Sequence, residues 1–599
     1  MKAAPDPGVV GGGTSVVAAV SSVGPGLAQA LPPPVSGAPS GAASAPAASP
    51  TLADILAESG DLGVPANRQR AVERMQAVER AARPAVIDRA RRAGLPLRVE
   101  RADGTVQEIA AFEGERPVYF TTHNVNAAIS TGANVLQGAA YGLSGAGVTI
   151  GLWDGGSARV THQEFAGATG SRITVKDGSA SIDHATHVSG TLAAAGVDAS
   201  ARGMAPAARV DSYDWNSDKS EMTARAATAP NQAGMLYLSN HSYGYVGGWN
   251  YVNGGSPSRV WEWYGDGTTA VGYEYDFGRY NTYARDSDAL AYSAPYFLMF
   301  RSAGNDRADN PVTGQAVALT PGSNTVVSYD TAVHPAGDGT YRSGFESICF
   351  DALGKNVVTI GSVSDAVTNG LRDTAMASVS YFSCWGPTDD GRIKPDLVAN
   401  GENLYSSLNG GDASYGIYSG TSMATPNALG TAVLLFEDYA RLFPGGAMRA
   451  STLKGLLIHT ADDRGNAGPD YKYGWGLINA KAASDLLRDH AANPLKVRLT
   501  EGVVTTARST VNLDFVWDGV TPIRATLCWT DPAATATTTN DLRTPRLVNN
   551  LDLKIVGPSG AAYLPYVMPF VGTWTQAAMD LPATTGKNTT DNVEQVYLA

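Results

Sequence analysis

Four polar side chains in this 599-residue chain are of the types needed for nucleophilic attack on a carbonyl group. A serine hydroxyl needs a histidine to take its proton, a carboxylate to hold that histidine, and hydrogen-bond donors for the oxyanion that develops. Ser422, His184 and Asp154 are the candidates for the first three roles. Asn305, together with the Ser422 amide, is the candidate for the donors. The sequence therefore offers one residue for each part of an acyl-transfer site.

Each candidate lies in a local sequence that suits its role. Asp154 follows the apolar run 147–153, which predicts a buried strand, and His184 lies near the start of a predicted helix. Asn305 ends the segment Ser-Ala-Gly-Asn. Ser422 lies in Ser-Gly-Thr-Ser-Met-Ala-Thr-Pro, where the first helical turn favours negative charge and tolerates Pro426. Taken singly, each residue also has an ordinary structural explanation as a turn or capping residue.

The order Asp, His, Asn, Ser in these contexts resembles the subtilisin-like serine proteases, or subtilases. The resemblance covers about residues 120–490 and extends to the segments 386–396 and 473–480. It implies that Asp154 orients His184, that His184 acts as general base and acid for Ser422, and that Asn305 contributes to an oxyanion hole. The chain departs from the family pattern at Ala185, at Gly155-Gly156 and at Asn400, but no departure removes a catalytic group.

The resemblance also implies a set of substrate-binding residues. Residues Ser242, Tyr243 and Gly244 follow a predicted strand and are similar to the family segment that pairs with an extended peptide. Residues Ser302, Ala303 and Gly304 would line the pocket for a substrate side chain. Tyr243 either narrows this cleft or serves only in packing.

Apolar runs alternate with predicted helices between residues 147 and 442. This alternation predicts an α/β fold with a doubly wound, mostly parallel sheet, and it places Asp154 at the carboxyl end of a strand, where such folds bind ligands. After residue 493 the pattern changes to short alternating runs, which predict a C-terminal antiparallel β-sandwich or barrel. The predicted strands of this part are 495–500, 510–517, 523–529 and 550–556.

We divide the chain into five parts. Residues 1–30 have features of a signal peptide, with Ala28-Gln29-Ala30 as the cleavage motif, although they also resemble the start of the Ala/Pro/Gly-rich tract that follows. The C-terminal part is similar to the β-barrel of one bacterial subtilase subgroup, which implies a cleaved prosegment. The chain ends within a predicted strand, so we expect one or two further strands to be missing. The parts are a signal peptide (1–30), a linker (31–50), a prosegment (51–118), the catalytic domain (119–490) and the β-barrel (495–599).

Composition and charge restrict the classes of molecule to which this protein can bind. A formal net charge of −12 argues against nucleic acid, and the sequence contains no apolar run of about 18 residues that would cross a membrane. We expect a monomer that acts on proteins or peptides outside the cytoplasm, as a secreted, surface or periplasmic protein. Three cysteines are too few for a disulfide scaffold. Cys349 and Cys384 could pair after export, or all three, with Cys528, could be isolated thiols.

Metal binding is expected only in a structural role. His184 and His187 have a spacing that can chelate, but no further ligand motif completes a site, and the proposed chemistry requires no cofactor. Subtilases commonly bind calcium, so the resemblance makes structural calcium a hypothesis. Residues with hard oxygen ligands occur near the C-terminus, although the same residues are also common in solvent-exposed turns that bind no metal. These are Asp531, Asn550, Asp552, Asp591 and Glu594.

The sequence is therefore interpreted as a secreted serine endopeptidase that forms an acyl-enzyme on Ser422. One alternative is a surface or adhesion protein that retains an inactive subtilase scaffold. Another is a maturation protease with narrow specificity.

Overall fold

The computed structural model describes residues 14–22, 84–85, 87–92, 98–100, 106–113, 116–121, 124–251, 261–321, 323–496 and 498–599. The chain separates into two compact units, Pro25–Thr122 and a larger unit of Met1–Gly24 with His123–Ala599. The linker predicted at 31–50 lies outside the described residues.

The smaller unit contains a three-stranded antiparallel sheet in the order β2-β3-β4. Its strands are β2 (Arg98–Glu100), β3 (Val106–Glu113) and β4 (Arg116–Thr121), and residues 87–92 are helical. The prosegment predicted at 51–118 ends within β4. Because β4 pairs with β3 through Thr121, residues 119–121 belong to this unit and not to the catalytic domain to which we assigned them.

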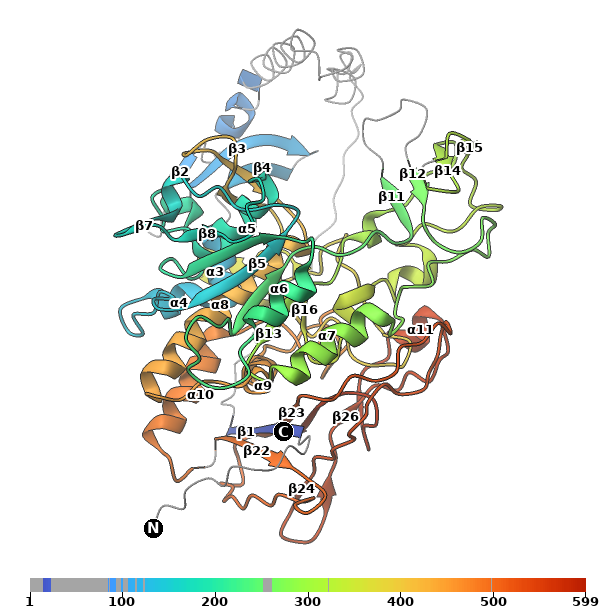
Figure 1. Cartoon of the computed structure of the whole chain (residues 1–599). Coiled ribbons are helices and arrows are strands. Elements are labelled where there is room, and N and C mark those ends of the chain that lie inside the picture. The colour runs from blue at the N-terminus through green and yellow to red at the C-terminus, as the bar shows by residue number, and fades with distance from the viewer. Residues whose placement is uncertain are drawn as a thin grey trace. The chain divides into compact units, whose positions relative to one another are not determined.

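The larger unit is built on a seven-stranded sheet in which every neighbouring pair is parallel (Figure 1). The strand order is β19-β16-β13-β10-β5-β9-β8. The strands are β5 (Thr149–Asp154), β8 (Ile173–Val175), β9 (Arg209–Asp214), β10 (Leu238–His241), β13 (Leu298–Ser302), β16 (Val358–Val363) and β19 (Leu397–Asn400). The predicted α/β fold is confirmed.

Helices cover both faces of this sheet. On one face, Leu152 packs in a core that includes residues of α5 (Asp183–Ala193) and α8 (Thr421–Leu442). On the other face, the next residue, Trp153, packs in a core that includes residues of α6 (Asp218–Arg225) and α7 (Thr282–Ser293). The remaining helices are α3 (Asn124–Thr131), α4 (Ala133–Gln137), α9 (Ala450–Thr460), α10 (Ala480–Ala492) and α11 (Gln576–Met579). Consecutive residues of β5 are thus fully buried on opposite faces, as a doubly wound sheet requires.

The C-terminal part contains an antiparallel sheet in the order β22-β1-β23-β28. Its strands are β1 (Thr14–Ser22), β22 (Leu499–Val504), β23 (Ile523–Trp529) and β28 (Val593–Leu598). The predicted antiparallel arrangement of the C-terminal strands is confirmed. The prediction of a strand at 510–517 is wrong, because these residues form no strand and Val516 is fully exposed. Strand β1 occupies the position between β22 and β23 that a consecutive strand would take. Residues 14–22, within the predicted signal peptide, are therefore paired along both edges.

The other short strands pair locally and do not alter the main sheets. The predicted strand 550–556 is reduced to β24 (Ile555–Val556), which pairs with β25 (Ala562–Tyr563). The hairpin formed by β20 (Leu404–Ser407) and β21 (Tyr415–Tyr418) leads directly into the segment of Ser422. Within the described parts of the chain, no helix has the length and apolar character needed to span a bilayer.

Candidate active site

The carboxylate of Asp154 and the imidazole of His184 are in direct contact. Asp154 ends β5 and is 1% exposed, and His184 is the second residue of α5. The Nδ1 atom of His184 lies 2.8 Å from Oδ1 and 2.8 Å from Oδ2 of Asp154. The neighbouring Asp183 instead accepts a hydrogen bond of 2.7 Å from the amide of Asn409. Asp154 is therefore the carboxylate that positions His184.

The two histidines of α5 have different electrostatic environments. Burial lowers the pKa of His184, but the charge and hydrogen bond of Asp154 outweigh burial and raise it above the ordinary value of 6.5. His187 is fully buried, and its Nε2 lies 2.9 Å from the carbonyl of Leu404. Burial lowers the pKa of His187 to about 3, so this imidazole is neutral at pH 7. His187 is thus a packing residue.

The helix that carries His184 is packed tightly against the β20–β21 hairpin. The ring of His187 stacks on Tyr418, with ring centroids 4.6 Å apart. The hydroxyl of Ser406 donates to the carbonyl of His187. A Cβ atom at Gly190 would lie 2.3 Å from the hydroxyl of Ser406, so only glycine permits this approach. These contacts join α5 to the segment that continues into Ser422.

Ser422 lies in the first turn of α8 and is bonded reciprocally to Ser242. Its hydroxyl donates to the carbonyl of Ser242 over 3.0 Å, and the hydroxyl of Ser242 donates to the carbonyl of Ser422 over 2.8 Å. Ser242 follows β10, which is the neighbour of β5 in the sheet. Among the described contacts, no hydrogen bond joins Ser422 Oγ to His184 Nε2. The hydroxyl is therefore directed toward the predicted substrate-binding segment.

Asn305 is oriented by Thr421. The Oδ1 atom of Asn305 accepts hydrogen bonds from the amide of Thr421 at 2.9 Å and from its hydroxyl at 3.0 Å. The Nδ2 group therefore faces away from Thr421. A Cβ atom at Gly420 would lie 3.5 Å from Asn305 Nδ2 and 3.6 Å from the amide nitrogen of Ser422. Because Gly420 has no side chain, the space beside it is open, and both candidate oxyanion donors border this space.

All six predicted substrate-binding residues line one cavity of about 420 Å³, together with Asn305 and Ser422. Ser242 and Gly244 come from the loop after β10, and Ser302 to Gly304 come from the end of β13. The ring of Tyr243 is fixed, because its hydroxyl bonds to Asp218 at 2.7 Å. Tyr243 therefore serves in packing and also forms part of the cavity wall. A larger cavity of about 1070 Å³ contains none of the four candidate catalytic residues.

Acidic side chains that sequence reasoning missed also line the smaller cavity. Asp306 and Asp309 lie on its wall, and no ion pair to either is found in the described part of the chain. Burial, with a smaller effect of Asp306, raises the pKa of Asp309 to about 8. Arg301 also lines the cavity, but it is paired with Asp351 at 3.0 Å. The only sequence signal was the position of the two acids, one and four residues after Asn305.

The three cysteines are free thiols, so the pairing of Cys349 with Cys384 is not found. The Sγ atom of Cys384 instead donates to Asp306 over 3.4 Å. Cys349 lines the cavity of about 420 Å³, and the two thiols are not bridged.

The five suggested calcium ligands do not form a cluster. Asp531 is buried against Lys355, and Asp591 accepts from the amide of Ile393 at 2.8 Å. Glu594 bonds the amide of Leu553, and Asp552 lies 3.6 Å from Lys587. Most of the carboxylate oxygens of these four acids therefore already have partners within the protein.

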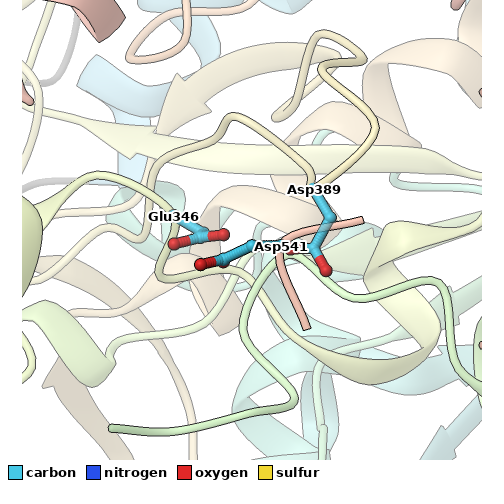
Figure 2. Close-up of side chains that lie close together, drawn as sticks. All are labelled: Glu346, Asp389 and Asp541. Atoms are coloured by element: carbon cyan, nitrogen blue, oxygen red, sulfur yellow. The ribbon is translucent and has the colours of Figure 1, made fainter. Parts of the chain in front are cut away.

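Three other acids, Glu346, Asp389 and Asp541, lie close together, each with an oxygen within 4.8 Å of the others (Figure 2). Arg342 bonds both oxygens of Asp541 and contacts Oε2 of Glu346, so two of these three carboxylates are paired with one arginine.

The α/β fold and the contact of Asp154 with His184 are those expected of a serine hydrolase, and comparison with known proteins agrees. A family model described as the Subtilase family matches residues 145–476. This chain belongs to the subtilase family of serine peptidases.

Curated relatives match only parts of their own length. The serine protease/ABC transporter B family protein tagB of Dictyostelium discoideum is 28% identical over 46% of this chain and 16% of its own. Serine protease AprX of Bacillus subtilis is 31% identical over 23% of this chain and 31% of its own. C5a peptidase of Streptococcus pyogenes is 35% identical over 20% of this chain and 11% of its own. The chain thus spans less than a third of the length of each of these relatives.

Proposed function

We propose that this protein is an exported serine endopeptidase that cleaves peptide bonds through an acyl-enzyme on Ser422. The observation that carries the proposal is the contact of His184 with both oxygens of Asp154, in a chain whose Ser422 faces a substrate-sized cavity. Export is supported only by the signal-like residues 1–30 and by the subtilase resemblance. The absence of a cofactor requirement follows from the chemistry, in which amino-acid side chains perform every step.

The chemistry begins when His184 accepts the proton of Ser422 as Oγ attacks the scissile carbonyl. The hydroxyl must first turn from the carbonyl of Ser242 toward His184, since catalytic hydrogen bonds often form only with substrate present. Asn305 Nδ2 and the Ser422 amide donate to the oxyanion of the tetrahedral intermediate. His184 then protonates the leaving amine, and water hydrolyses the acyl-enzyme by the same steps.

Substrate would bind as an extended peptide beside residues 242–244. Main-chain groups of this segment provide hydrogen bonds that do not depend on substrate sequence, and the cavity below receives one side chain. This arrangement suits cleavage within a polypeptide. We propose that the protein acts as a monomer and that residues 51–118 are removed as a prosegment.

An inactive scaffold is the less favoured alternative, because all four candidate groups are present and Asp154 is bonded to His184. Casein hydrolysis by the purified, processed protein tests the proposal. Wild type should hydrolyse casein, and Ser422→Ala should lose activity by roughly 10⁴-fold or more. Ser220→Ala, which removes a hydroxyl from α6, should retain the activity of the wild type. Equal activity of wild type and Ser422→Ala, or no activity in either, would sink the proposal.

A peptide library distinguishes a maturation protease of narrow specificity from a broadly acting degradative enzyme. Cleavage of many unrelated sequences supports a degradative enzyme, whereas one or two cleaved motifs support maturation. Mass spectrometry of both ends of the exported chain tests export and prosegment removal together.

A further inference from the structure

The connecting segment, residues 509–517 between β22 and β23, exposes large apolar side chains. Val511, Phe515 and Trp517 are 43%, 44% and 49% exposed. Together with Leu513 they occupy every second position, so an extended segment would carry all four on one side. Such a pattern is typical of a strand with one buried face, yet all residues of the connecting segment are described and none of them forms a strand.

The chain already turns back at both ends of the connecting segment. Before it, Thr505 and Arg508 exchange two main-chain hydrogen bonds, of 3.2 and 3.1 Å, around a two-residue turn. After it, the carboxylate of Asp518 accepts a hydrogen bond from the amide of Thr521 at 2.7 Å, which closes a second turn. Turns of this kind connect neighbouring antiparallel strands. The connecting segment therefore has the turns that a strand between β22 and β23 requires.

Strand β1 occupies the position between β22 and β23. It is antiparallel to both of them, and Val16 lies opposite Gly502 on one side and opposite Trp529 on the other. A strand that took this position from β1 would have to run in the same direction. The connecting segment would do so, because a hairpin turn at each end makes it antiparallel to both neighbours.

The turn before the connecting segment sets the register that the segment would adopt. Continuing the pairing of Thr505 with Arg508 places Val511 opposite Gly502, which is the residue that Val16 now faces. From this point residues 509–517 correspond one to one with Thr14–Ser22 of β1. The two segments thus have the same length, direction and register in the sheet.

The side of β23 that would receive the apolar residues is itself apolar and buried. Ile523, Ala525 and Leu527 are each at most 7% exposed, and the first two pack with Ile555 and Val596. Directly opposite residues of antiparallel strands lie on the same side of a sheet. In the register given above, three residues of the connecting segment lie opposite them: Trp517, Phe515 and Leu513. Insertion would therefore remove exposed apolar surface from water.

We propose that residues 14–22 and the connecting segment compete for one position in the C-terminal sheet, and that the connecting segment takes it when residues 14–22 leave. Short hairpin connections make the pairing of the connecting segment local, whereas residues 23–498 separate β1 from β22. Signal-peptide cleavage, where it occurs, removes residues 14–22 and starts the exchange. The sheet is then built from the C-terminal part alone, and this exchange does not depend on peptidase activity.

The first test measures hydrogen–deuterium exchange in the full chain carrying Ser422→Ala, which prevents self-cleavage. In the parent chain, amides of β1 should exchange slowly and those of the connecting segment rapidly. Val17→Pro with Ala18→Pro excludes β1 from the position, because proline lacks the amide hydrogen that a central strand donates. In this proline variant the connecting segment should exchange at least about 100-fold more slowly than in the parent.

Two controls accompany this measurement. Val17→Ile with Ala18→Ser retains both amides of β1 and should behave as the parent. Peptides from α8 should exchange slowly in every chain, which shows that the catalytic part is folded. The proposal is overturned if the connecting segment exchanges as fast in the proline variant as in the parent.

A cysteine cross-link tests the register. Leu513→Cys with Leu527→Cys places two thiols opposite each other after the exchange, within reach of a disulfide. Copper phenanthroline should join them in the proline variant but not in the parent, where Ala18 of β1 lies opposite Leu527. Asn512→Cys with Leu527→Cys is the matched control, because neighbouring residues of a strand point to opposite sides. Equal cross-linking of the two pairs in the proline variant would also overturn the proposal.

Discussion

The Nδ1 atom of His184 lies 2.8 Å from each carboxylate oxygen of Asp154, although residues 155–183, which include β8, separate the two in the sequence. The contact forms because β5 ends at Asp154 and α5 begins at Asp183, at the same edge of the sheet. It leaves Nε2 of His184 available for proton transfer.

Replacing Asp154 by Asn should lower kcat by about 10⁴-fold, because an amide no longer holds His184 in the tautomer that accepts a proton. Hydrolysis of a chromogenic peptide measures the effect. Asp183→Asn is the matched control, since Asp183 bonds the amide of Asn409, and it should retain nearly full activity. A loss of similar size in both variants would show that Asp154 has no special role.

The pH dependence of kcat/KM should report His184. Only its neutral form accepts the proton of Ser422, so activity falls as pH decreases through the pKa of His184. Because Asp154 raises that pKa, the acidic limb should lie above pH 6.5, and Asp154→Asn should move it to lower pH. A wild-type limb below pH 6.5 would contradict the assigned contact.

Asn305→Ala should lower kcat by about 10²–10³-fold with little change in KM, because the lost donor acts mainly on the oxyanion. Steady-state kinetics separate the two constants. Thr421→Ser keeps both the amide and the hydroxyl that bond Asn305 Oδ1, and it should behave as wild type. A change confined to KM in Asn305→Ala would indicate a binding role only.

Asp306 and Asp309 should favour substrates with a lysine or arginine side chain in the cavity. Both carboxylates line it, whereas Arg301 is already paired with Asp351. At about pH 9, above the pKa of about 8 to which burial raises Asp309, peptides that differ only at the residue before the cleaved bond should show kcat/KM at least about tenfold higher for lysine than for glutamate. Asp309→Asn should reduce this ratio, and a ratio unchanged by the substitution would remove Asp309 from the preference.

The buried pair of Lys355 and Asp531 should contribute to stability between the catalytic and C-terminal parts. Both side chains are fully buried, and Asp531 also accepts hydrogen bonds from the amides of Val548 and Asn549. Lys355→Ala leaves a buried carboxylate without its cation and should lower the free energy of unfolding by about 3–5 kcal/mol. Denaturant unfolding measures the loss. Lys481→Ala, in an exposed pair with Asp485, should change it by less than about 1 kcal/mol.

Local patterns in the sequence were sufficient to predict that the central sheet is doubly wound and mostly parallel. The run before Asp154 contains only one polar residue, Thr149, because β5 is covered on both faces, and this burial is visible as composition. The alternating run 510–517 misled us, because alternation shows only that a segment can pair. Whether it does pair depends on a partner, and β1 occupies the position beside β22 and β23.

The sequence alone determined the candidate nucleophile, base, carboxylate and oxyanion donor, because each requires a particular side chain in a recognisable short context. Only the tertiary structure decided how Thr421 orients Asn305, that Tyr243 is fixed by Asp218, and that the Ser422 hydroxyl bonds Ser242. It also brought Asp541 to Glu346 and Asp389, residues that no motif connects. Such contacts join distant segments, and their geometry depends on how strands and helices pack rather than on any local pattern.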